Sequence, residues 1–427
     1  MLRKLAASAA LVLALPLAGG AMSVAAEAAP APAYDTHVTY HQWKGTPGFK
    51  HGTSDGTVVD HGALRIARPV GTLDYTDPFG DGSAVTYDYA TWLSPTVSTA
   101  FGLTELVSSW NATTPAGTWI QVEVSGTTET GAQTKWYVLG RWASYDEGFH
   151  RTSVDGQKDD DGTVYTDTFA TRNDHTLEDY RLRLTLYRKA GTTATPKVTM
   201  LGAMASAVPD DTPTDTPLGG AEGIVLDVPT YSQEIHKGQY PQYDNGGEAW
   251  CSPTSTAMVL DYWGAGPTPE ETSWVDPSYA DPQVDHAARS VFDYTYDGAG
   301  NWPFNAAYAG SRGLEGFVTR LRSLTEAEQF IKKGIPLVTS LSFEKGELDG
   351  AGYGTNGHLM VLVGFDADGN PVMNDPASHL IASDDQVRVT YDRAQFEQAW
   401  SHSGRIVYVI HPASVKLPKP PKGEANW

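Results

Sequence analysis

The stretch around Cys251 constrains this chain more than any other. Residues 246–264 read GGEAWCSPTSTAMVLDYWG, and they contain the only cysteine among 427 residues. Pro253 suits the first position of a helix, because its fixed φ is helical and its missing N–H needs no partner there. Gly264 suits the end of that helix. A thiol at a helix start faces unpaired N–H groups and the positive end of the helix dipole, which favour the thiolate. Cys251 is therefore predicted to be a nucleophile.

The N-terminus carries the pattern of an export signal. Arg3 and Lys4 precede a short apolar run over residues 5–17, and Ala26-Glu27-Ala28 fits a cleavage site. We expect residues 1–28 to be a signal peptide and the mature protein to be secreted, extracellular and soluble. The apolar run is too short for a membrane span, so no membrane partner is expected. Cysteines usually pair outside the cell, and a single cysteine has no partner in its own chain.

The alternative for Cys251 is a buried, inert thiol that acts as a small apolar side chain. Its position before a helix favours the nucleophile. The formal net charge of −21 disfavours nucleic acid as a partner, since phosphates are bound by Lys and Arg. We attribute that charge to solubility outside the cell.

Residues 40–206 have the pattern of an all-β domain. Residues 119–124 and 180–187 alternate between apolar and polar side chains, and residues 135–142 form an aromatic-rich run. Turns rich in Gly, Asp and Thr separate these runs. Short alternating strands joined by such turns predict a β-sandwich, which we expect to be jelly-roll-like.

Two features of this domain have competing interpretations. Trp110, Trp119, Trp136 and Trp142 either fill the core or stack on sugar rings. Core packing is the commoner use, so carbohydrate stays as an alternative partner of the sandwich. The acidic run 159–161, with Asp155 nearby, has the oxygen ligands of a calcium site but not the full ligand spacing. We interpret it as a solvated loop.

A second domain follows a linker. Residues 207–223 are rich in Pro, Asp and Thr, which predicts an extended, semi-stiff segment. The second domain is expected over residues 224–412, and residues 413–427 are expected to form a tail beyond the fold.

In the second domain, helix comes before sheet. A strand over residues 224–228 and the helix after Cys251 come first. A capping box from Thr325 to Glu328 predicts the start of another helix. Strands are predicted at residues 336–343, 359–365, 388–391 and 406–411. This order is typical of an α+β fold.

A cysteine nucleophile needs a base and a group that orients it. His358 follows Gly357 at the start of the apolar strand 359–365. The turn at residues 366–370 brings the next strand back along this one, so Asp375 returns close to His358. A carboxylate on one imidazole nitrogen leaves the other nitrogen for the thiol. Asn374 is the alternative orienting group.

The tetrahedral intermediate needs hydrogen-bond donors for its oxyanion. The backbone N–H of Cys251 is one candidate. Side-chain amides upstream supply the second, and the spacing does not choose among Gln233, Gln239, Gln242 and Asn245.

The combined motifs resemble those of the bacteriocin-leader-peptidase-like family of papain-like cysteine peptidases, in its secreted actinobacterial type. The matching segments are VPTYSQ at 228–233, WCSPTS at 250–255, Gly357-His358 and NDP at 374–376. The resemblance implies a papain-like fold over residues 224–412. It implies Cys251 as nucleophile, His358 as base, Asp375 as orienting group and Gln233 as oxyanion donor. Many relatives have Cys-Gly-Pro where this chain has Cys-Ser-Pro, so Ser252 is expected to narrow the site.

The sequence therefore predicts a secreted cysteine peptidase that hydrolyses peptide bonds through an acyl-enzyme, with no metal or organic cofactor. Its expected substrate is a protein or peptide, including cell-wall peptide. One alternative is a cell-wall amidase or endopeptidase that uses the same triad. The other is a glycan-binding or adhesion protein whose papain-like domain is inert.

Overall fold

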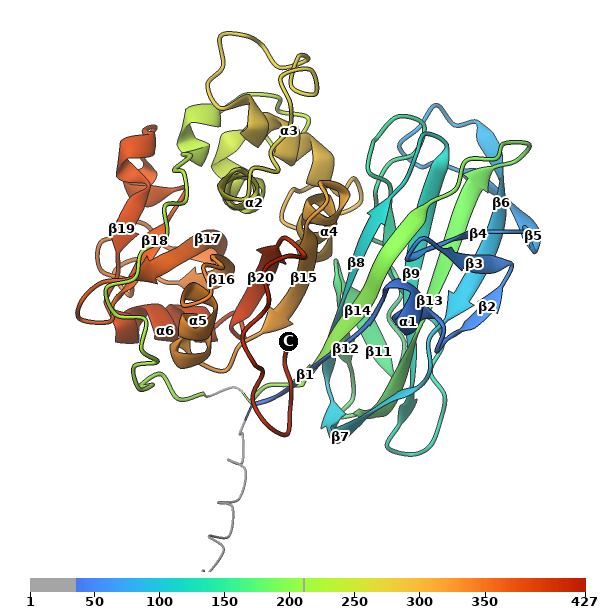
Figure 1. Ribbon diagram of the computed structural model, residues 1–427, viewed down its shortest axis with the longest axis horizontal. Helices are drawn as coiled ribbons and strands as arrows, with labels where there is room; N and C mark the ends of the chain where they lie inside the picture. Colours follow the sequence, from blue (N-terminus) through green and yellow to red (C-terminus); the bar gives the residue numbers. More distant parts are fainter. Residues whose placement is uncertain (1–35, 210–211) are drawn as a thin grey trace, which may run out of the picture. The chain divides into compact units, whose positions relative to one another are not determined.

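Two seven-stranded antiparallel sheets form the N-terminal region of the computed structural model, which describes residues 36–209 and 212–427 (Figure 1). The predicted signal peptide, residues 1–28, lies outside the described residues. The first sheet has the order β11 (Gly162–Tyr165), β12 (Thr168–Thr171), β8 (Glu105–Thr113), β14 (Lys197–Ala207), β4 (Ala63–Ile66), β3 (Thr57–Asp60), and β1 (His37–Lys44) also pairs with β14. The short helix α1 (Gly45–Phe49) follows β1.

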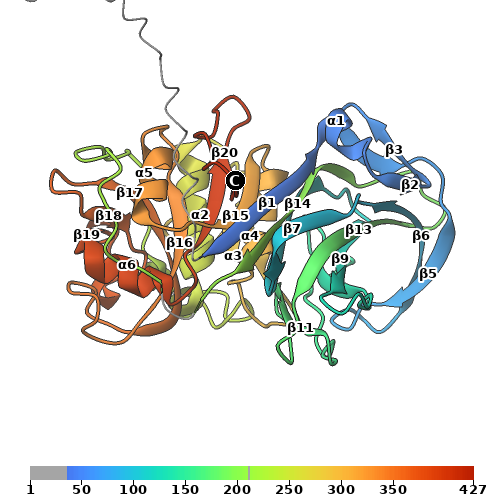
Figure 2. The same ribbon diagram turned by 90° about the horizontal axis from the view of Figure 1, so that it is seen from below.

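The second sheet is built around the longest strands. Its order is β10 (Tyr137–Trp142), β9 (Thr118–Thr128), β13 (Leu177–Lys189), β6 (Ala84–Leu93), β2 (Thr53–Asp55), with β5 (Gly71–Thr76) beside β6 and β7 (Val97–Leu103) beside β13. Figure 2 shows the strands of both sheets from a second side. The predicted sandwich is confirmed.

The predicted alternation sets the sandwich core. Ile120, Val122 and Val124 of β9 lie opposite Leu186, Leu184 and Leu182 of β13, and all six side chains are completely buried. The other face of β9 is also covered, because Trp119 stacks between other aromatic rings. Its ring lies 3.7 Å from that of Tyr187 and 4.5 Å from that of Phe149.

The core interpretation of the tryptophans is confirmed for Trp110, Trp119 and Trp142, which are at most 1% exposed. Trp136 is half-buried beneath the guanidinium of Arg183, 4.4 Å from its ring centre. In the acidic run, the Asp159 carboxylate is engaged within the fold. It pairs with Lys135 at 2.9 Å and accepts the backbone N–H groups of Asp161 and Gly162.

The C-terminal region has one six-stranded antiparallel sheet with helices packed on it. The sheet has the order β15 (Glu315–Arg320), β20 (Ile406–His411), β16 (Leu337–Phe343), β17 (Thr355–Phe365), β18 (Pro371–Asn374), β19 (Arg388–Thr390). The helices are α2 (Cys251–Tyr262), α3 (Pro282–Val291), α4 (Trp302–Ser311), α5 (Leu324–Ile331) and α6 (Arg393–Ser401). Short 3-10 turns lie at η1 (Gln233–His236), η2 (Gly247–Ala249), η3 (Ser378–Leu380) and η4 (Asp384–Gln386).

Local expectations in this region needed correction at three places. The strand predicted at residues 224–228 is reduced to one bridge, from Val225 to Gly364 of β17. Helix α2 begins at Cys251 itself rather than at Pro253. Helix α5 is capped by Ser323, whose Oγ accepts the N–H of Glu326, and not by Thr325.

The shift of the α5 cap has a physical reason. Ser323 has an extended backbone, with φ of −167°, as an N-cap requires. Glu328, predicted to belong to the capping box, is fully buried and binds the linker instead. Its carboxylate accepts the N–H groups of Gly219 and Ala221 and pairs with Arg393 at 2.8 Å.

The linker lies against the peptidase-like region. Arg405 donates to the Oγ1 of Thr212 at 2.6 Å and to the carbonyl of Pro213 at 2.5 Å. Thr216 Oγ1 donates to Glu397 at 2.5 Å. Buried charged groups of the C-terminal region therefore hold the linker in place.

The expectation of a C-terminal tail beyond the fold is wrong for its last residues. Asn426 is completely buried, and the Trp427 ring packs 4.9 Å from that of Phe330 in α5. The carbonyl of Ala425 accepts the N–H of Tyr40 in β1 at 2.8 Å. Residues 413–427 have the Pro and Lys content of a free tail, but a few side chains near their end anchor them to the fold.

The sandwich covers the β15 edge of the C-terminal sheet. The side-chain amide of Asn111 in β8 binds both backbone groups of Gly316, at 2.8 and 3.3 Å. The hydroxyl of Ser109 accepts the N–H of Val318 at 2.9 Å. An exposed edge strand invites pairing with another chain, so the sandwich protects this one.

Candidate active site

Cys251 is the first residue of α2, at the end of a tightly turned approach. The preceding turn, η2, needs Gly246, whose φ is 96° and where a Cβ would lie 2.8 Å from the carbonyl oxygen of Gln239. Trp250 is completely buried, and its indole N–H donates to the carbonyl of Tyr243 at 2.5 Å. Residues 252–260 of the helix are buried as well. The half-exposed thiol therefore stands on a rigid core helix.

Ser252 does not have the predicted effect on the site. It is completely buried, and its hydroxyl forms a 3.0 Å hydrogen bond with that of Tyr408 in β20. The side chain anchors α2 to the sheet instead of narrowing the space around the thiol.

His358 and Asp375 meet as the hairpin predicted. In the register of the sheet Asn374 lies opposite Val361, and Asp375 comes directly after β18. The Nε2 of His358 lies 2.8 Å from the Oδ1 of Asp375. Asp375 is completely buried, and His358 is only 4% exposed. This contact leaves the Nδ1 of His358 for a second partner.

Two tyrosines that the sequence did not predict complete the carboxylate's surroundings. The hydroxyls of Tyr353 and Tyr391 donate to the Oδ2 of Asp375 at 2.8 and 2.7 Å. The N–H of Ala377 donates to its Oδ1 at 3.0 Å. Burial alone would raise the pKa of Asp375, but the charge of His358 and the hydrogen bonds from His358, Tyr391 and Tyr353 hold that pKa below its ordinary value.

The charge on His358 follows from the same contacts. Burial lowers its pKa, whereas the charge of Asp375, the hydrogen bond to Asp375 and a hydrogen bond with the thiol of Cys251 raise it. The raising contributions prevail, and the pKa of His358 reaches about 10. At neutral pH this imidazole is protonated beside the sulfur, an arrangement that stabilises a thiolate.

Gln233 is the upstream amide that reaches the site. It is 3% exposed in η1 and lines the same cavity as Cys251 and His358. Its Nε2 donates to the carbonyl of Glu248 at 2.9 Å, which uses one of the two amide hydrogens. The other three candidates are placed elsewhere: Gln239 bonds to buried His236, and Gln242 and Asn245 are exposed.

Asn374 does not orient the histidine. Its Nδ2 donates to the carbonyl of Pro229 at 2.9 Å, and its Oδ1 accepts from Arg388 at 3.0 Å. The amide thus joins the N-terminal segment of this region to β19. Of the two alternatives, Asp375 is the one that contacts His358.

The cavity that joins these groups has a volume of about 630 Å³. Its lining combines aromatic and acidic side chains with residues of β17 and η3. The aromatic and acidic lining residues include Asp244, Glu248, Tyr296 and Trp302, and the others include Thr355 and Asn356 of β17 and Leu380 of η3. Burial raises the pKa of Asp244, and the neighbouring Asp297 raises it further. In residues 36–209 and 212–427, no three His, Cys, Asp or Glu side chains are grouped to hold a metal ion.

The fold and the site together define a class, the papain-like cysteine peptidases. Residues 225–408 match the model of the Peptidase_C39 like family, and residues 39–206 match that of the Peptidase C39 N-terminal domain, of the actinobacterial type. The chain therefore belongs to the C39 family of papain-like peptidases. This confirms the resemblance stated from the motifs and the α+β fold expected for residues 224–412.

Solved structures resemble the chain only weakly. One is the CBM22-1–GH10 part of xylanase 10B from Clostridium thermocellum in complex with xylohexaose, with 10% identity and a TM-score of 0.18. That match covers 46% of this chain and 31% of the other, so the chain spans about a third of that structure. The carbohydrate-binding module TmCBM61, in complex with β-1,4-galactotriose, matches with 10% identity and a TM-score of 0.17, over 39% of this chain and 86% of the module.

Matches at these TM-scores support no conclusion about function. No curated protein shows a significant match to the chain. Among the helices of the described residues, none is long and apolar enough to cross a membrane.

Proposed function

We propose that this protein is a secreted cysteine peptidase, with Cys251 as nucleophile, His358 as acid and base, and Asp375 as orienting group. The observation that carries the proposal is that Cys251 and His358 line one cavity and that His358 is bonded at 2.8 Å to Asp375, which is completely buried. Hydrolysis by a thiol nucleophile requires a nucleophile, a base and a group that orients the base, and these three residues supply those roles. Secretion is proposed from the signal pattern of residues 1–28.

The reaction follows from the charges of the site. The Cys251 thiolate attacks the carbonyl carbon, and the C–N bond breaks as His358 gives its proton to the leaving amine. The product is an acyl-enzyme. A water molecule then attacks the thioester while His358 takes its proton, and the C–S bond breaks to release the acid and the thiolate.

The oxyanion of each tetrahedral intermediate needs two donors. The backbone N–H of Cys251 lies at the start of α2, where N–H groups have no partner within the helix. The second amide hydrogen of Gln233 is the other donor in this proposal. A single donor of this kind contributes on the order of 10²–10³ in rate.

The substrate is proposed to be a protein or peptide, with cell-wall peptide included. The test is cleavage of a peptide library, casein and purified peptidoglycan by the wild type and by Cys251→Ala. We expect cleavage by the wild type and none by Cys251→Ala. Equal activity of the two proteins would refute the proposal.

Two further outcomes separate the alternatives. Release of peptides from peptidoglycan without cleavage of library peptides would favour a cell-wall amidase on the same triad. Absence of all hydrolysis, together with binding of the wild type to insoluble glycans, would favour a binding protein with an inert papain-like domain.

A further inference from the structure

One wall of the catalytic cavity comes from residues 293–302, which lead from α3 to the first residue of α4. Tyr296, Gly300 and Trp302 of this segment line the cavity. Tyr296 is 50% exposed, as expected of a side chain that is free to touch a ligand. The segment belongs to the peptidase region by sequence, but many of its contacts come from the sandwich.

Three hydrogen bonds attach this segment to the sandwich, at both of its ends. The N–H of Ser153 donates to the Oδ1 of Asp293 at 2.9 Å, and the N–H of Tyr294 donates to the carbonyl of Arg151 at 3.0 Å. At the other end, the N–H of Trp302 donates to the Oδ2 of Asp167 at 2.7 Å. The sandwich thus fixes the backbone on either side of Tyr296.

Asp167 is held in an unusual turn. It follows β11, and its N–H donates to the carbonyl of Tyr165 at 2.6 Å, two residues earlier. The residue between them, Thr166, has a φ of 54°, which is unfavourable for a β-branched side chain. Such strain persists where the surrounding structure enforces it, and it is frequent at functional sites. Asp167 itself is only 6% exposed.

The hydrogen bond that Asp167 accepts from the Trp302 N–H lies at the start of α4. Trp302 is the first residue of that helix, and the side chain of Asn301 accepts the N–H of Phe304 at 3.1 Å. Two of the N–H groups at this helix start therefore have partners, one from each region of the chain.

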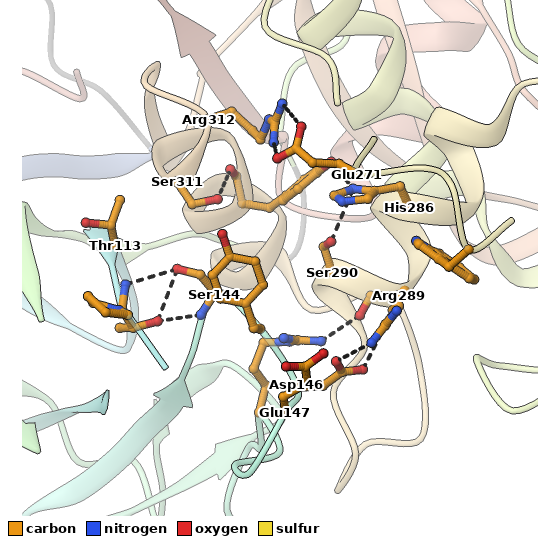
Figure 3. Close-up of a pocket in the computed structure, with 16 residues that line it drawn as sticks. Thr113, Ser144, Asp146, Glu147, Glu271, His286, Arg289, Ser290, Ser311 and Arg312 are labelled. Atoms are coloured by element: carbon orange, nitrogen blue, oxygen red, sulfur yellow. Dashed lines mark hydrogen bonds and ion pairs between the residues drawn. The ribbon is translucent and has the colours of Figure 1, made fainter. Parts of the chain in front are cut away.

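The elements on either side of the segment are anchored to the sandwich as well. Figure 3 shows Asp146 of the sandwich facing Arg289 of α3, with a closest contact of 2.9 Å. Phe304 of α4 packs against Trp142 at 5.3 Å and Trp110 at 6.1 Å, in an apolar core shared by both regions. The interface is thus both charged and apolar around residues 293–302.

We propose that the sandwich is a working part of the catalytic cavity, because it holds the substrate-facing wall of residues 293–302 in place through Asp167. Asp167 is a positioning residue, since it binds the backbone N–H of Trp302 and acts on Tyr296 through the backbone of residues 293–302. The kinetic part of this inference rests on the proposed peptidase function.

The test compares Asp167→Ala, Asp167→Asn and the control Asp155→Asn, which removes an exposed carboxylate of the same region. For a peptide that the wild type cleaves, Asp167→Ala is expected to raise KM about tenfold, the fold-change that 1.4 kcal/mol produces, with kcat changed less than twofold. Asp167→Asn keeps an oxygen acceptor for the Trp302 N–H, so it is expected to stay within threefold of the wild type. Asp155→Asn is expected to behave as the wild type.

Hydrogen exchange of the amides in residues 293–302 supplies the second readout. We expect faster exchange there in Asp167→Ala and unchanged exchange in α2. Unchanged exchange and unchanged KM would overturn the proposal, and so would equal losses of kcat and thermal stability in the Ala and Asn variants. If Asp167→Ala does not fold, Asp167→Ser, which is too short to reach Trp302, takes its place.

The exchange measurement also separates the two proposals. If the wild type cleaves no peptide, the proposed function fails, but the exchange of residues 293–302 still tests the attachment. Faster exchange in Asp167→Ala would then support the attachment to the sandwich, and unchanged exchange would overturn it.

Discussion

At the scale of single residues, the site depends on what surrounds a buried carboxylate. Asp375 accepts hydrogen bonds from His358, from Tyr353 and Tyr391, and from a backbone N–H. This environment keeps the pKa of Asp375 low, and the charge of Asp375 in turn raises the pKa of His358 to about 10. The nucleophile, at the start of its helix, then faces a protonated base.

The raised pKa of His358 predicts the pH range of the site. A group whose folded pKa exceeds its ordinary value of 6.5 stabilises the fold fully below 6.5, and this contribution is lost as the pH rises through about 10. Asp375→Asn removes the charge that raises the pKa, while burial still lowers it. We therefore expect the alkaline fall of kcat/KM, near pH 10 in the wild type, to move toward neutral pH in Asp375→Asn. An unmoved alkaline limb would contradict this account of His358.

Gln233 gives a second prediction at this scale. If its free amide hydrogen binds the oxyanion, Gln233→Ala is expected to lower kcat by about 10²–10³ with little change in KM, since the bond forms chiefly in the transition state. Steady-state kinetics measure both constants, with exposed Gln242→Ala as the control. A variant that raised KM and kept kcat would instead assign Gln233 to substrate binding.

At the scale of elements, the sequence predicted those strands and hairpins that follow from the local periodicity of apolar residues. The hairpin of β17 and β18 followed from an apolar strand, an Asp-rich turn and a return strand, so His358 and Asp375 were predicted as neighbours. Tyr353 and Tyr391 were not predicted, because their bonds to Asp375 span 22 and 16 residues and depend on how the loops pack. The α5 cap was misplaced by two residues because Ser323 and Thr325 each precede a Glu by three.

The corrected cap of α5 can be tested by a pair of substitutions. Ser323→Ala removes the acceptor of the Glu326 N–H and is expected to lower the free energy of unfolding by about 1 kcal/mol. Thr325→Ala lacks that capping role and is expected to cost less. Denaturant unfolding compares the two variants, and a Ser323→Ala variant as stable as the wild type would contradict the cap at Ser323.

At the scale of the whole molecule, the two regions are joined more tightly than a Pro-rich linker suggests. The apolar core runs from the sandwich into α4, and the linker and the C-terminal residues are both bound to the peptidase region. Composition did not predict this docking, because a segment's average polarity conceals a few buried anchors such as Asn426 and Trp427. The fold of each domain was predictable from its periodicity, whereas the interface depends on long-range contacts.

The docked C-terminus gives a prediction at this scale. Trp427→Ala removes the ring that packs on Phe330 and the indole bond to the carbonyl of Pro418. Because Trp427 is half-buried, we expect a loss of about 1–3 kcal/mol in the free energy of unfolding, below the usual cost for a fully buried Trp. Thermal unfolding checks this, with exposed Tyr165→Ala as the control. A Trp427 variant as stable as the wild type would show that these last residues add nothing to the fold.

The central claim is that Cys251 and His358 act as a pair. Its most direct test is the rate at which iodoacetamide alkylates Cys251 between pH 5 and 10, in the wild type and in His358→Asn. Because a protonated His358 stabilises the thiolate, we predict that the wild type reacts at least tenfold faster than the variant at pH 6. The variant is predicted to gain reactivity only above about pH 8, as an ordinary thiol does. Identical pH profiles of the two proteins would contradict the account.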